Sequence, residues 1–289
     1  MSIPLTLEVL IRSWEKQLLL QIQEMSTLPV ALHPITPTNL IFRSSTPCSR
    51  HLAAFLTDSS LKSILTTQLP FNTSLVFATY FGGNGSDGIA GIALDNSENI
   101  YVTGSTSSSN LPGASVSTIQ SAFGGTYDAF AAKINAAGTA IVYSTYLGGN
   151  RSDFGKAIAV NAGGNVFVAG DVMPPSSGTY NFPLVHPIQG TPGGGQYDVF
   201  AAKINAAGTA LDYSTFLGGA LSDRAMGIAV DSQGSAFVAG VTESADYPVK
   251  NPISGHDHIL GDTGREVDGF VTRLSPLGTT FIYSTFLGG

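Results

Sequence analysis

Aspartates at one repeated position are the first residues of this chain that could do chemistry. Each follows a serine and lies five residues after the first glycine of a Gly-Gly pair: Asp87, Asp153 and Asp223. Carboxylate oxygens are preferred ligands of hard cations, so a ring of these aspartates could hold Ca²⁺. The same position also suits an aspartate that caps its own turn by accepting hydrogen bonds from nearby N–H groups. We favour the turn cap, because every unit needs the turn and few would need a ligand.

A histidine pair forms the second candidate site. His256 and His258 lie in a long loop, and Asp262 and Glu266 follow them. Histidine and carboxylate side chains are ordinary metal ligands, although one His-x-His pair in a loop is a weak signature. The sequence has no nucleophile motif, phosphate-binding loop, His-Glu-x-x-His or cysteine pair, so we expect no catalytic and no cofactor-binding residues.

These candidates belong to a repeat. The phrase Thr-aromatic-x-Gly-Gly occurs four times at intervals of about 70 residues, beginning at Thr79, Thr145, Thr215 and Thr285. A fixed period of this size indicates an array of one supersecondary unit. We place the array over residues 75–289, in units of about 80–146, 146–216 and 216–286.

Each unit predicts four strands in a fixed order. In the first unit, a strand of small residues at 91–95 precedes a second strand at 100–104. A long loop leads to a third strand at 128–134, and a tight turn leads to a fourth at 141–147. Charge pairs such as Asp128 with Lys133 recur in the third strand, and we assign them to a solvated face rather than to a binding stripe.

The turns between strands place Asn or Asp first and Gly fourth, as at 161–164. Glycine adopts the left-handed backbone conformation without steric cost. In the first unit this position is Glu98, for which a left-handed backbone costs about 1 kcal/mol. We therefore expect either a different turn there or a strained one.

Repeated sets of four antiparallel strands predict an all-β fold of β-propeller blades, since the coils of a solenoid would run parallel. Residues 75–81 match the fourth strand, which predicts about three four-stranded blades plus one surplus outer strand in an incomplete ring. We expect either a fragment of a longer propeller or a short chain that closes by oligomerisation. Open blade edges would favour self-association in both cases.

The first 70 residues do not share the repeat. Apolar side chains at steps of three and four, from Leu7 to Met25, predict one face of a short helix. Five prolines then predict an irregular continuation: Pro29, Pro34, Pro37, Pro47 and Pro70. We therefore expect a first domain, 1–70, that is helical and then irregular.

Composition narrows the classes of partner. The net charge of −7 and the lack of a basic run argue against a nucleic-acid partner. No apolar run approaches the ~18 residues of a transmembrane helix, and Arg12 and Glu15 interrupt the region where a signal peptide needs an apolar core. The single Cys48 forms no intrachain disulfide, which fits a reducing compartment or an exported protein without disulfides.

Several spaced motifs resemble those of a known family. They are Tyr-Ser-Thr-Tyr-Leu-Gly-Gly at 143–149, Ile-Ala-Val-Asp at 228–231, Gly-Asn-Val-Phe-Val-Ala-Gly at 164–170, Phe-Pro at 182–183 and Asp-Val-Phe-Ala-Ala-Lys at 198–203. This pattern resembles the bacterial β-propeller repeat called SBBP, and its first two elements are also similar to NHL-type propeller repeats. The resemblance covers about 75–289. It implies a propeller, often in secreted or surface-associated bacterial proteins, and supplies no agreed enzymatic residues.

The expected function is that of a non-catalytic scaffold. We expect it to bind protein or glycan through the loops 105–126, 171–196 and 241–266, with Phe182-Pro183 and Tyr247-Pro248 pinning two of them to the blades. One alternative is a propeller enzyme, a hydrolase or lyase, with a site on the loop face. Another is a purely structural spacer. The resemblance implies an extracellular or cell-surface location.

Overall fold

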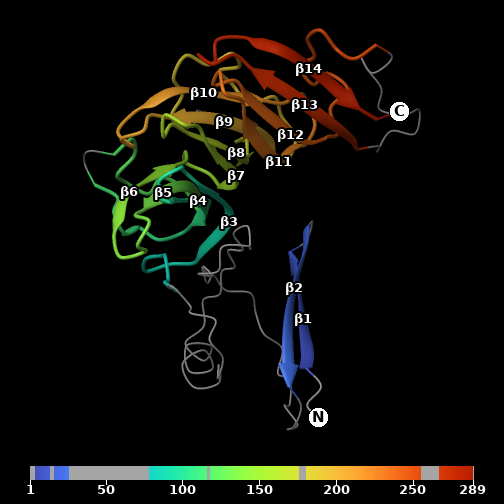
Figure 1. Ribbon diagram of the computed structural model, residues 1–289. Coiled ribbons are helices and arrows are strands. Elements are labelled where there is room, and N and C mark those ends of the chain that lie inside the picture. Colours follow the sequence, from blue (N-terminus) through green and yellow to red (C-terminus); the bar gives the residue numbers. More distant parts are fainter. Residues whose placement is uncertain are drawn as a thin grey trace.

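The computed structural model describes residues 78–115, 118–175, 180–254 and 267–288, together with the backbone of strands 4–13 and 16–25. Three four-stranded antiparallel sheets, here called blades 1, 2 and 3, make up the repeat region (Figure 1). In each blade the strands lie side by side in chain order. Their bounds are β3 (Asp87–Leu94), β4 (Ile100–Thr106), β5 (Asp128–Ile134) and β6 (Ile141–Leu147) in blade 1; β7 (Asp153–Val160), β8 (Val166–Val172), β9 (Asp198–Ile204) and β10 (Leu211–Leu217) in blade 2; β11 (Asp223–Val230), β12 (Ala236–Thr242), β13 (Asp268–Leu274) and β14 (Phe281–Leu287) in blade 3.

The four predicted strands of each unit are thus confirmed, and with them the all-β fold of propeller blades. The third and fourth strands keep their predicted bounds, whereas the first begins four residues early, at the aspartate. The reason is pairing with the second strand, which is longer than predicted: Asp87 pairs with Thr106 at its far end.

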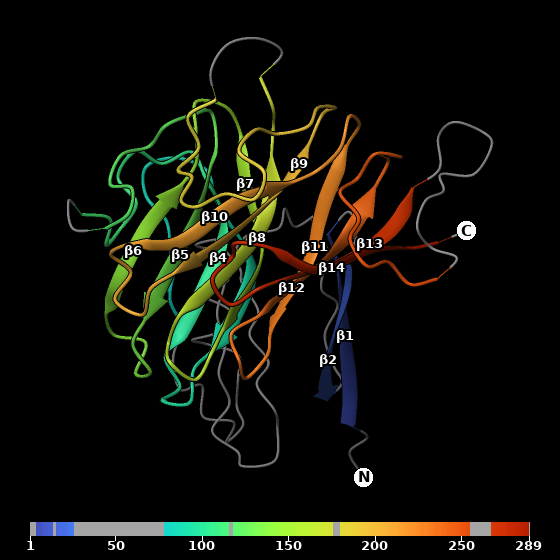
Figure 2. The same cartoon turned by 90° about the horizontal axis from the view of Figure 1, so that it is seen from above.

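The blades follow one another in an arc, with the small-residue strands β3, β7 and β11 on its inner side (Figure 1). β7 contacts both β3 and β11, so the inner strands set the spacing of neighbouring blades. Figure 2 shows the same arc from above, with blade 1 on the left and blade 3 on the right. In the described part of the chain the blades do not close a ring, as the sequence predicted.

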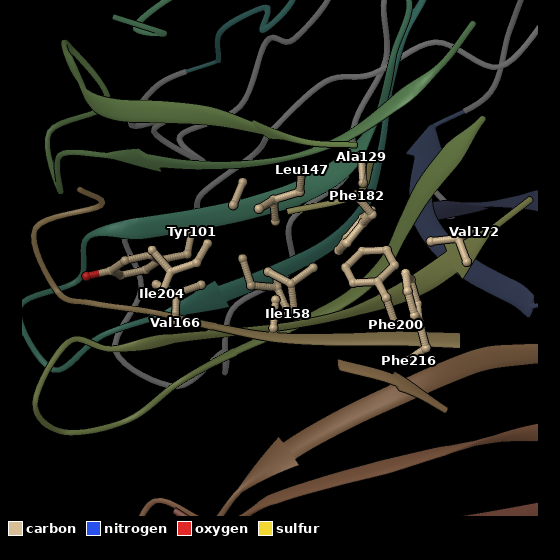
Figure 3. Packing of buried hydrophobic residues seen from close by; sticks show 13 residues of the cluster. Tyr101, Ala129, Leu147, Ile158, Val166, Val172, Phe182, Phe200, Ile204 and Phe216 are labelled. Carbon is tan, nitrogen blue, oxygen red and sulfur yellow. The ribbon is translucent and has the colours of Figure 1, made fainter. Parts of the chain in front are cut away.

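Apolar side chains fill the spaces between blades. Tyr101 and Leu147 of blade 1 lie in one cluster with Phe200 and Phe216 of blade 2 (Figure 3). All four are at most 1% exposed. Burying one such side chain stabilises the fold by about 1.5–3 kcal/mol, so this packing joins the blades into one body.

The predicted N-terminal helix is wrong. The backbone forms an antiparallel hairpin of β1 (Pro4–Ser13) and β2 (Lys16–Met25) instead. The helix was predicted from apolar residues at every third or fourth position. Leu5, Leu7, Val9 and Ile11 are also apolar at every second position, which is the period of a strand. β-Branched residues favour that alternative. The irregular segment expected up to residue 70 lies outside the described residues.

The surplus outer strand is not formed in its described part. Residues 78–81 have no strand pairing, and residues 75–77 lie outside the described residues. A fourth strand needs a third strand of its own blade as neighbour, and none precedes this segment among the described residues. Phe81 is nevertheless buried, and its ring stacks on Phe130 of blade 1 with a centroid distance of 5.3 Å.

Candidate functional site

One end of every blade carries the Gly-Gly corner, the start of the first strand and the long loop between the second and third strands. We call this end the loop rim. In blade 1 it is defined by the neighbouring strand residues Asp87, Thr106 and Asp128. The described parts of the long loops therefore lie at one rim of the arc.

The aspartates first considered as calcium ligands cap the Gly-Gly corners. The second glycine of each corner donates its N–H to the carboxylate that follows, at 2.8 Å for Gly83 to Asp87, 2.7 Å for Gly149 to Asp153 and 2.7 Å for Gly219 to Asp223. Hydroxyl groups complete the caps: Ser108 donates to Asp87, Tyr180 to Asp153 and Ser244 to Asp223. These contacts account for the recurrence of the residue without a ligand.

A second set of aspartates lies at the loop rim, and the predicted solvated face is wrong for them. Asp128 and Asp198, the first residues of β5 and β9, are fully buried rather than on a solvated face. Asp128 accepts N–H groups of Gly124 at 2.8 Å and Gly125 at 3.1 Å, because the loop folds back over it. Lys133 lies at the other end of the strand, with its Nζ 3.7 Å from Asp95.

The two sets of aspartates meet at the junctions between blades. A Cβ built on Gly218 would lie 1.9 Å from Asp198 Oδ1 of blade 2 and 3.0 Å from Asp223 Oδ2 of blade 3. Both aspartates are fully buried, and Oδ1 of each has no hydrogen-bond partner. Two ionised carboxylates accept but do not donate hydrogen bonds, so such a pair requires either a shared proton or a cation.

Burial favours the protonated form of these aspartates over binding of a cation. It raises the pKa of Asp198 to about 8, and the charge of Asp223 contributes in the same direction. Burial likewise raises the pKa of Asp223. At the junction of blades 1 and 2, burial raises the pKa of Asp128 to about 6 and that of Asp153 to about 7. The Asp198–Asp223 pair therefore retains a proton close to neutral pH, and we expect it to titrate as a unit.

The metal predictions gain no support from this geometry. Across the described ranges there is no group of three or more His, Cys, Asp or Glu side chains placed to hold a metal ion. Ca²⁺ takes six to eight oxygen ligands, which an aspartate pair alone does not supply. Calcium binding by Asp87, Asp153 and Asp223 stays a prediction, and His256 and His258 lie outside the described residues.

The long loops are fastened to the outer strands by the threonine of the repeated phrase. In blade 2, Thr215 Oγ1 accepts the N–H groups of Ile188 at 3.0 Å and Gln189 at 2.9 Å. Thr145 binds the N–H of Gln120 in blade 1 at 2.9 Å, and Thr285 binds that of Ile253 in blade 3 at 3.1 Å. The threonine was recognised in the sequence only as a marker of the repeat.

Glutamine side chains add a second fastening in two blades. Gly218 donates its N–H to Gln189 Oε1 at 3.2 Å, and Gly148 donates to Gln120 Oε1 at 3.0 Å. The loop thereby holds the Gly-Gly corner that leads to the next blade. Loop position and blade junction are coupled by these hydrogen bonds.

Aromatic side chains pin two loops, as predicted. Phe182 is 5% exposed and lies with its ring centroid 4.9 Å from that of Phe200. Tyr247 is 2% exposed and stacks on Phe270 at 4.5 Å. These contacts fix the base of each loop against its own blade.

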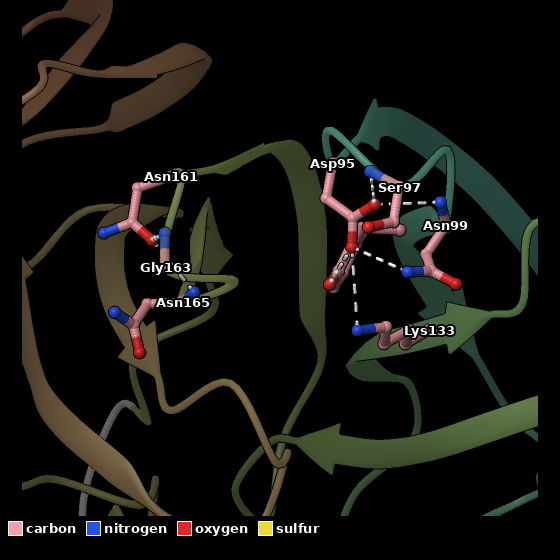
Figure 4. A network of polar contacts seen from close by, with 8 residues as sticks. Asp95, Ser97, Asn99, Lys133, Asn161, Gly163 and Asn165 are labelled. Carbon is pink, nitrogen blue, oxygen red and sulfur yellow. Dashed lines mark hydrogen bonds and ion pairs between the residues drawn. The ribbon is translucent and has the colours of Figure 1, made fainter.

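The opposite rim contains compact turns. Asp95 accepts the N–H groups of Ser97 at 2.9 Å and Asn99 at 3.0 Å, and Asn161 holds the matching turn of blade 2 (Figure 4). Glu98 has φ = 63°, where the matching Gly164 has φ = 77°. The blade 1 turn is thus the strained version, one of the two outcomes expected.

Comparison with known families agrees with the blade geometry. Residues 76–112 match the family model described as SBBP, Beta-propeller repeat. No curated protein matches the chain. The similarity to NHL repeats stays a prediction. Within the described residues, no helix is long and apolar enough to span a membrane. The chain carries the beta-propeller repeat of the SBBP family at residues 76–112, and its three blades have the four-stranded form that this repeat predicts.

Proposed function

We propose that this chain is a non-catalytic propeller scaffold that binds protein or glycan through the loop rim. The observation that carries the proposal is a contrast within the loops. Their bases are fastened by the same threonine contacts in every blade, while the exposed residue that follows the bridge to the outer strand differs: Ser115 in blade 1, His186 in blade 2 and Asn251 in blade 3.

This contrast favours binding over a spacer role. A spacer needs the fastened bases but has no use for different exposed residues at matching positions. Variable residues on a rigid framework are the usual arrangement of a binding surface.

Burial of the junction aspartates favours a scaffold over an enzyme. A general acid or base must come within hydrogen-bond distance of its substrate. Asp128, Asp153, Asp198 and Asp223 are fully buried and hold their own corners and loops. Their raised pKa values follow from burial between blades.

A glycan array and a panel of surface proteins test the proposal. We expect the chain to bind a defined subset of ligands. Replacing the exposed residues at 186–187 and 190–191 with Gly and Ser, with Gln189 retained, should remove that binding. A matched replacement of the opposite-rim residues 206–207 should leave it intact. Equal loss in both variants, or no binding by the parent chain, would refute the proposal.

We also propose self-association through the outward face of blade 3. Phe237, Ala239 and Val271 are half-buried there, whereas the equivalent residues of blade 2 are covered by blade 3: Phe167, Ala169 and Ala201. Sedimentation velocity should show concentration-dependent association that Val271→Lys weakens and Val142→Lys, at a site 56% exposed on another blade, does not. A monomer at all concentrations would contradict this.

The resemblance to SBBP repeats supports a further proposal, that the chain acts outside the cell or at a bacterial surface. Labelling of intact cells with a membrane-impermeant reagent should modify the protein. Labelling only after lysis would contradict an external location.

A further inference from the structure

Aromatic and cationic side chains form a ladder across the loop rim, from blade 1 to blade 3. Tyr127 stacks on Phe154 with a centroid distance of 6.0 Å, and Phe154 and Tyr197 form a T-shaped pair with a centroid distance of 6.3 Å. The guanidinium of Arg224 lies over Tyr197 at 4.9 Å, and Lys156 Nζ lies 5.6 Å from the centre of the Phe154 ring. All five residues are half-buried, so each retains accessible surface.

The ladder departs from the repeat. The position of Phe154 is Gly88 in blade 1 and Arg224 in blade 3, and the position of Lys156 is Ala90 and Met226. The blades fold with these other residues, so blade structure does not require the ladder. Accessible residues that differ from the other repeats indicate a role other than blade structure.

Lys156 and Arg224 lie close together because both contact the same buried aspartate, Asp171. Lys156 is the extra residue of a bulge in β7, where the pairing shifts between Gly155 and Ala157. The same bulge occurs in β3 and β11, where the extra residue is Ala90 and Met226, so blade 2 alone places a cation at this position. Asp171 is fully buried and lies 3.4 Å from Lys156 Nζ and 3.3 Å from Arg224 Nε. This ion triad holds both cations beside the rings with a surplus of one positive charge.

We propose that the ladder binds an acidic oligosaccharide. The face of an aromatic ring is electronegative and attracts the C–H groups of a flat sugar ring. Arg224 presents a planar donor group suited to a carboxylate. Partly accessible rings with a few polar groups are the usual composition of a small-molecule site. The inference rests on the proposed binding role of the loop rim, because Tyr127 and Tyr197 end two of its loops.

Stacked bases and phosphates would also find rings and cations here. The net charge of −7 opposes a polyphosphate chain, since binding of nucleic acid relies on many cations. A short sugar with one or a few carboxylates needs only the local positive charge. The chemistry therefore favours an acidic glycan.

Titration calorimetry with trigalacturonate tests the proposal, with maltotriose and a thymidine hexanucleotide as comparison ligands. We expect saturable binding of trigalacturonate that is at least tenfold tighter than that of maltotriose and weakens with added salt. Tyr197→Leu and Arg224→Gln should each lower the affinity by roughly five- to tenfold, as loss of a stacking or charged contact does.

Arg273 provides the matched control. Its guanidinium lies over the Phe237 ring at 5.0 Å in blade 3, away from the ladder. Arg273→Gln should leave trigalacturonate binding unchanged. Equal loss in the ladder and control variants, absence of trigalacturonate binding, or tighter binding of the hexanucleotide would overturn the inference.

Failure of the ladder proposal can be distinguished from failure of the proposed function. If Tyr197→Leu leaves array binding intact while replacement of the exposed loop residues removes it, the loop rim binds ligands but the ladder is not the site.

Discussion

Replacing Asp198 with asparagine should make the stability of this protein less dependent on pH. In the parent chain, Asp198 and Asp223 are buried together, and burial raises the pKa of Asp198 to about 8. An asparagine amide has the shape of a protonated carboxyl and donates a hydrogen bond to Asp223 at every pH. The variant thus keeps the contact and removes the titration.

The direction in which stability changes with pH follows from the raised pKa of Asp198. A carboxyl with a higher pKa in the folded protein than in the unfolded chain, where it is about 3.9, stabilises the fold fully below the unfolded value. That contribution is lost as pH rises through the folded value. We therefore expect the parent chain to lose stability between about pH 4 and pH 8, the window between the two pKa values.

The magnitude follows from the same pKa. Over that window each pH unit removes about 1.4 kcal/mol per proton retained by the folded state. Between pH 5 and pH 7 the free energy of unfolding of Asp198→Asn, relative to the parent, should rise by about 2–3 kcal/mol. The contributions of Asp128 and Asp153, which lie at the other junction, cancel in this difference because both proteins contain them.

Urea unfolding at pH 5, 6, 7 and 8 and constant ionic strength measures the difference. Asp268→Asn is the matched control: it has the same place in blade 3, where no first-strand aspartate of a following blade is among the described residues. Its stability should run parallel to that of the parent. Parallel curves for Asp198→Asn would refute the shared proton. Stabilisation of the parent chain by Ca²⁺ at pH 8, absent in Asp198→Asn, would show that a cation takes its place.

Three further substitutions, with Gly227→Ala as a control, test the turns, the contacts between blades and the hydrogen bonds that hold the loops. Glu98→Gly should raise the free energy of unfolding by about 0.5–1 kcal/mol, because a left-handed residue loses its strain, and calorimetry would show a higher Tm. Gly278→Ala should lower it by at least about 2 kcal/mol, since φ is +67° and the new Cβ would lie 2.1 Å from the Tyr213 ring, whereas Gly227→Ala, with no atom within 4 Å, should change it by less than about 1 kcal/mol. Equal effects of the two alanines would contradict the packing of that turn against the neighbouring blade. Thr215→Val should cost about 1–2 kcal/mol and speed proteolysis within 180–196, because the N–H groups of Ile188 and Gln189 lose their acceptor; unchanged cleavage would contradict the fastening.

Local patterns sufficed to predict the blades. The third strand begins at an aspartate after a glycine-rich loop and ends at a turn with glycine, so its bounds at 128–134 follow from neighbouring residues. The N-terminal segment was predicted wrongly for the same kind of reason. Its apolar residues satisfy both a helical and an alternating pattern, and the antiparallel pairing of Leu7 with Ile22 in the hairpin is not visible in either.

The aspartate pairs at the junctions between blades could not be predicted from local sequence patterns. Asp198 and Asp223 come from different blades and meet only because the outer strand of one blade turns at Gly218 into the inner strand of the next. The fastening of Gln189 by Thr215 likewise joins residues far apart in the sequence. A recurring threonine and a recurring aspartate were visible signals, but their partners depend on how the long loop folds back.

Amide hydrogen exchange of the free protein tests most directly whether the loops are preformed parts of the blades. The N–H groups of Ile188, Gln189 and Phe216 bind loop and strand together, at 3.0, 2.9 and 3.1 Å from their acceptors. We expect these amides to exchange as slowly as those in the middle of β9, while exposed residues at 190–191 exchange quickly. Rapid exchange at Ile188 and Gln189, with slow exchange retained in β9, would contradict a fixed loop rim on a rigid scaffold.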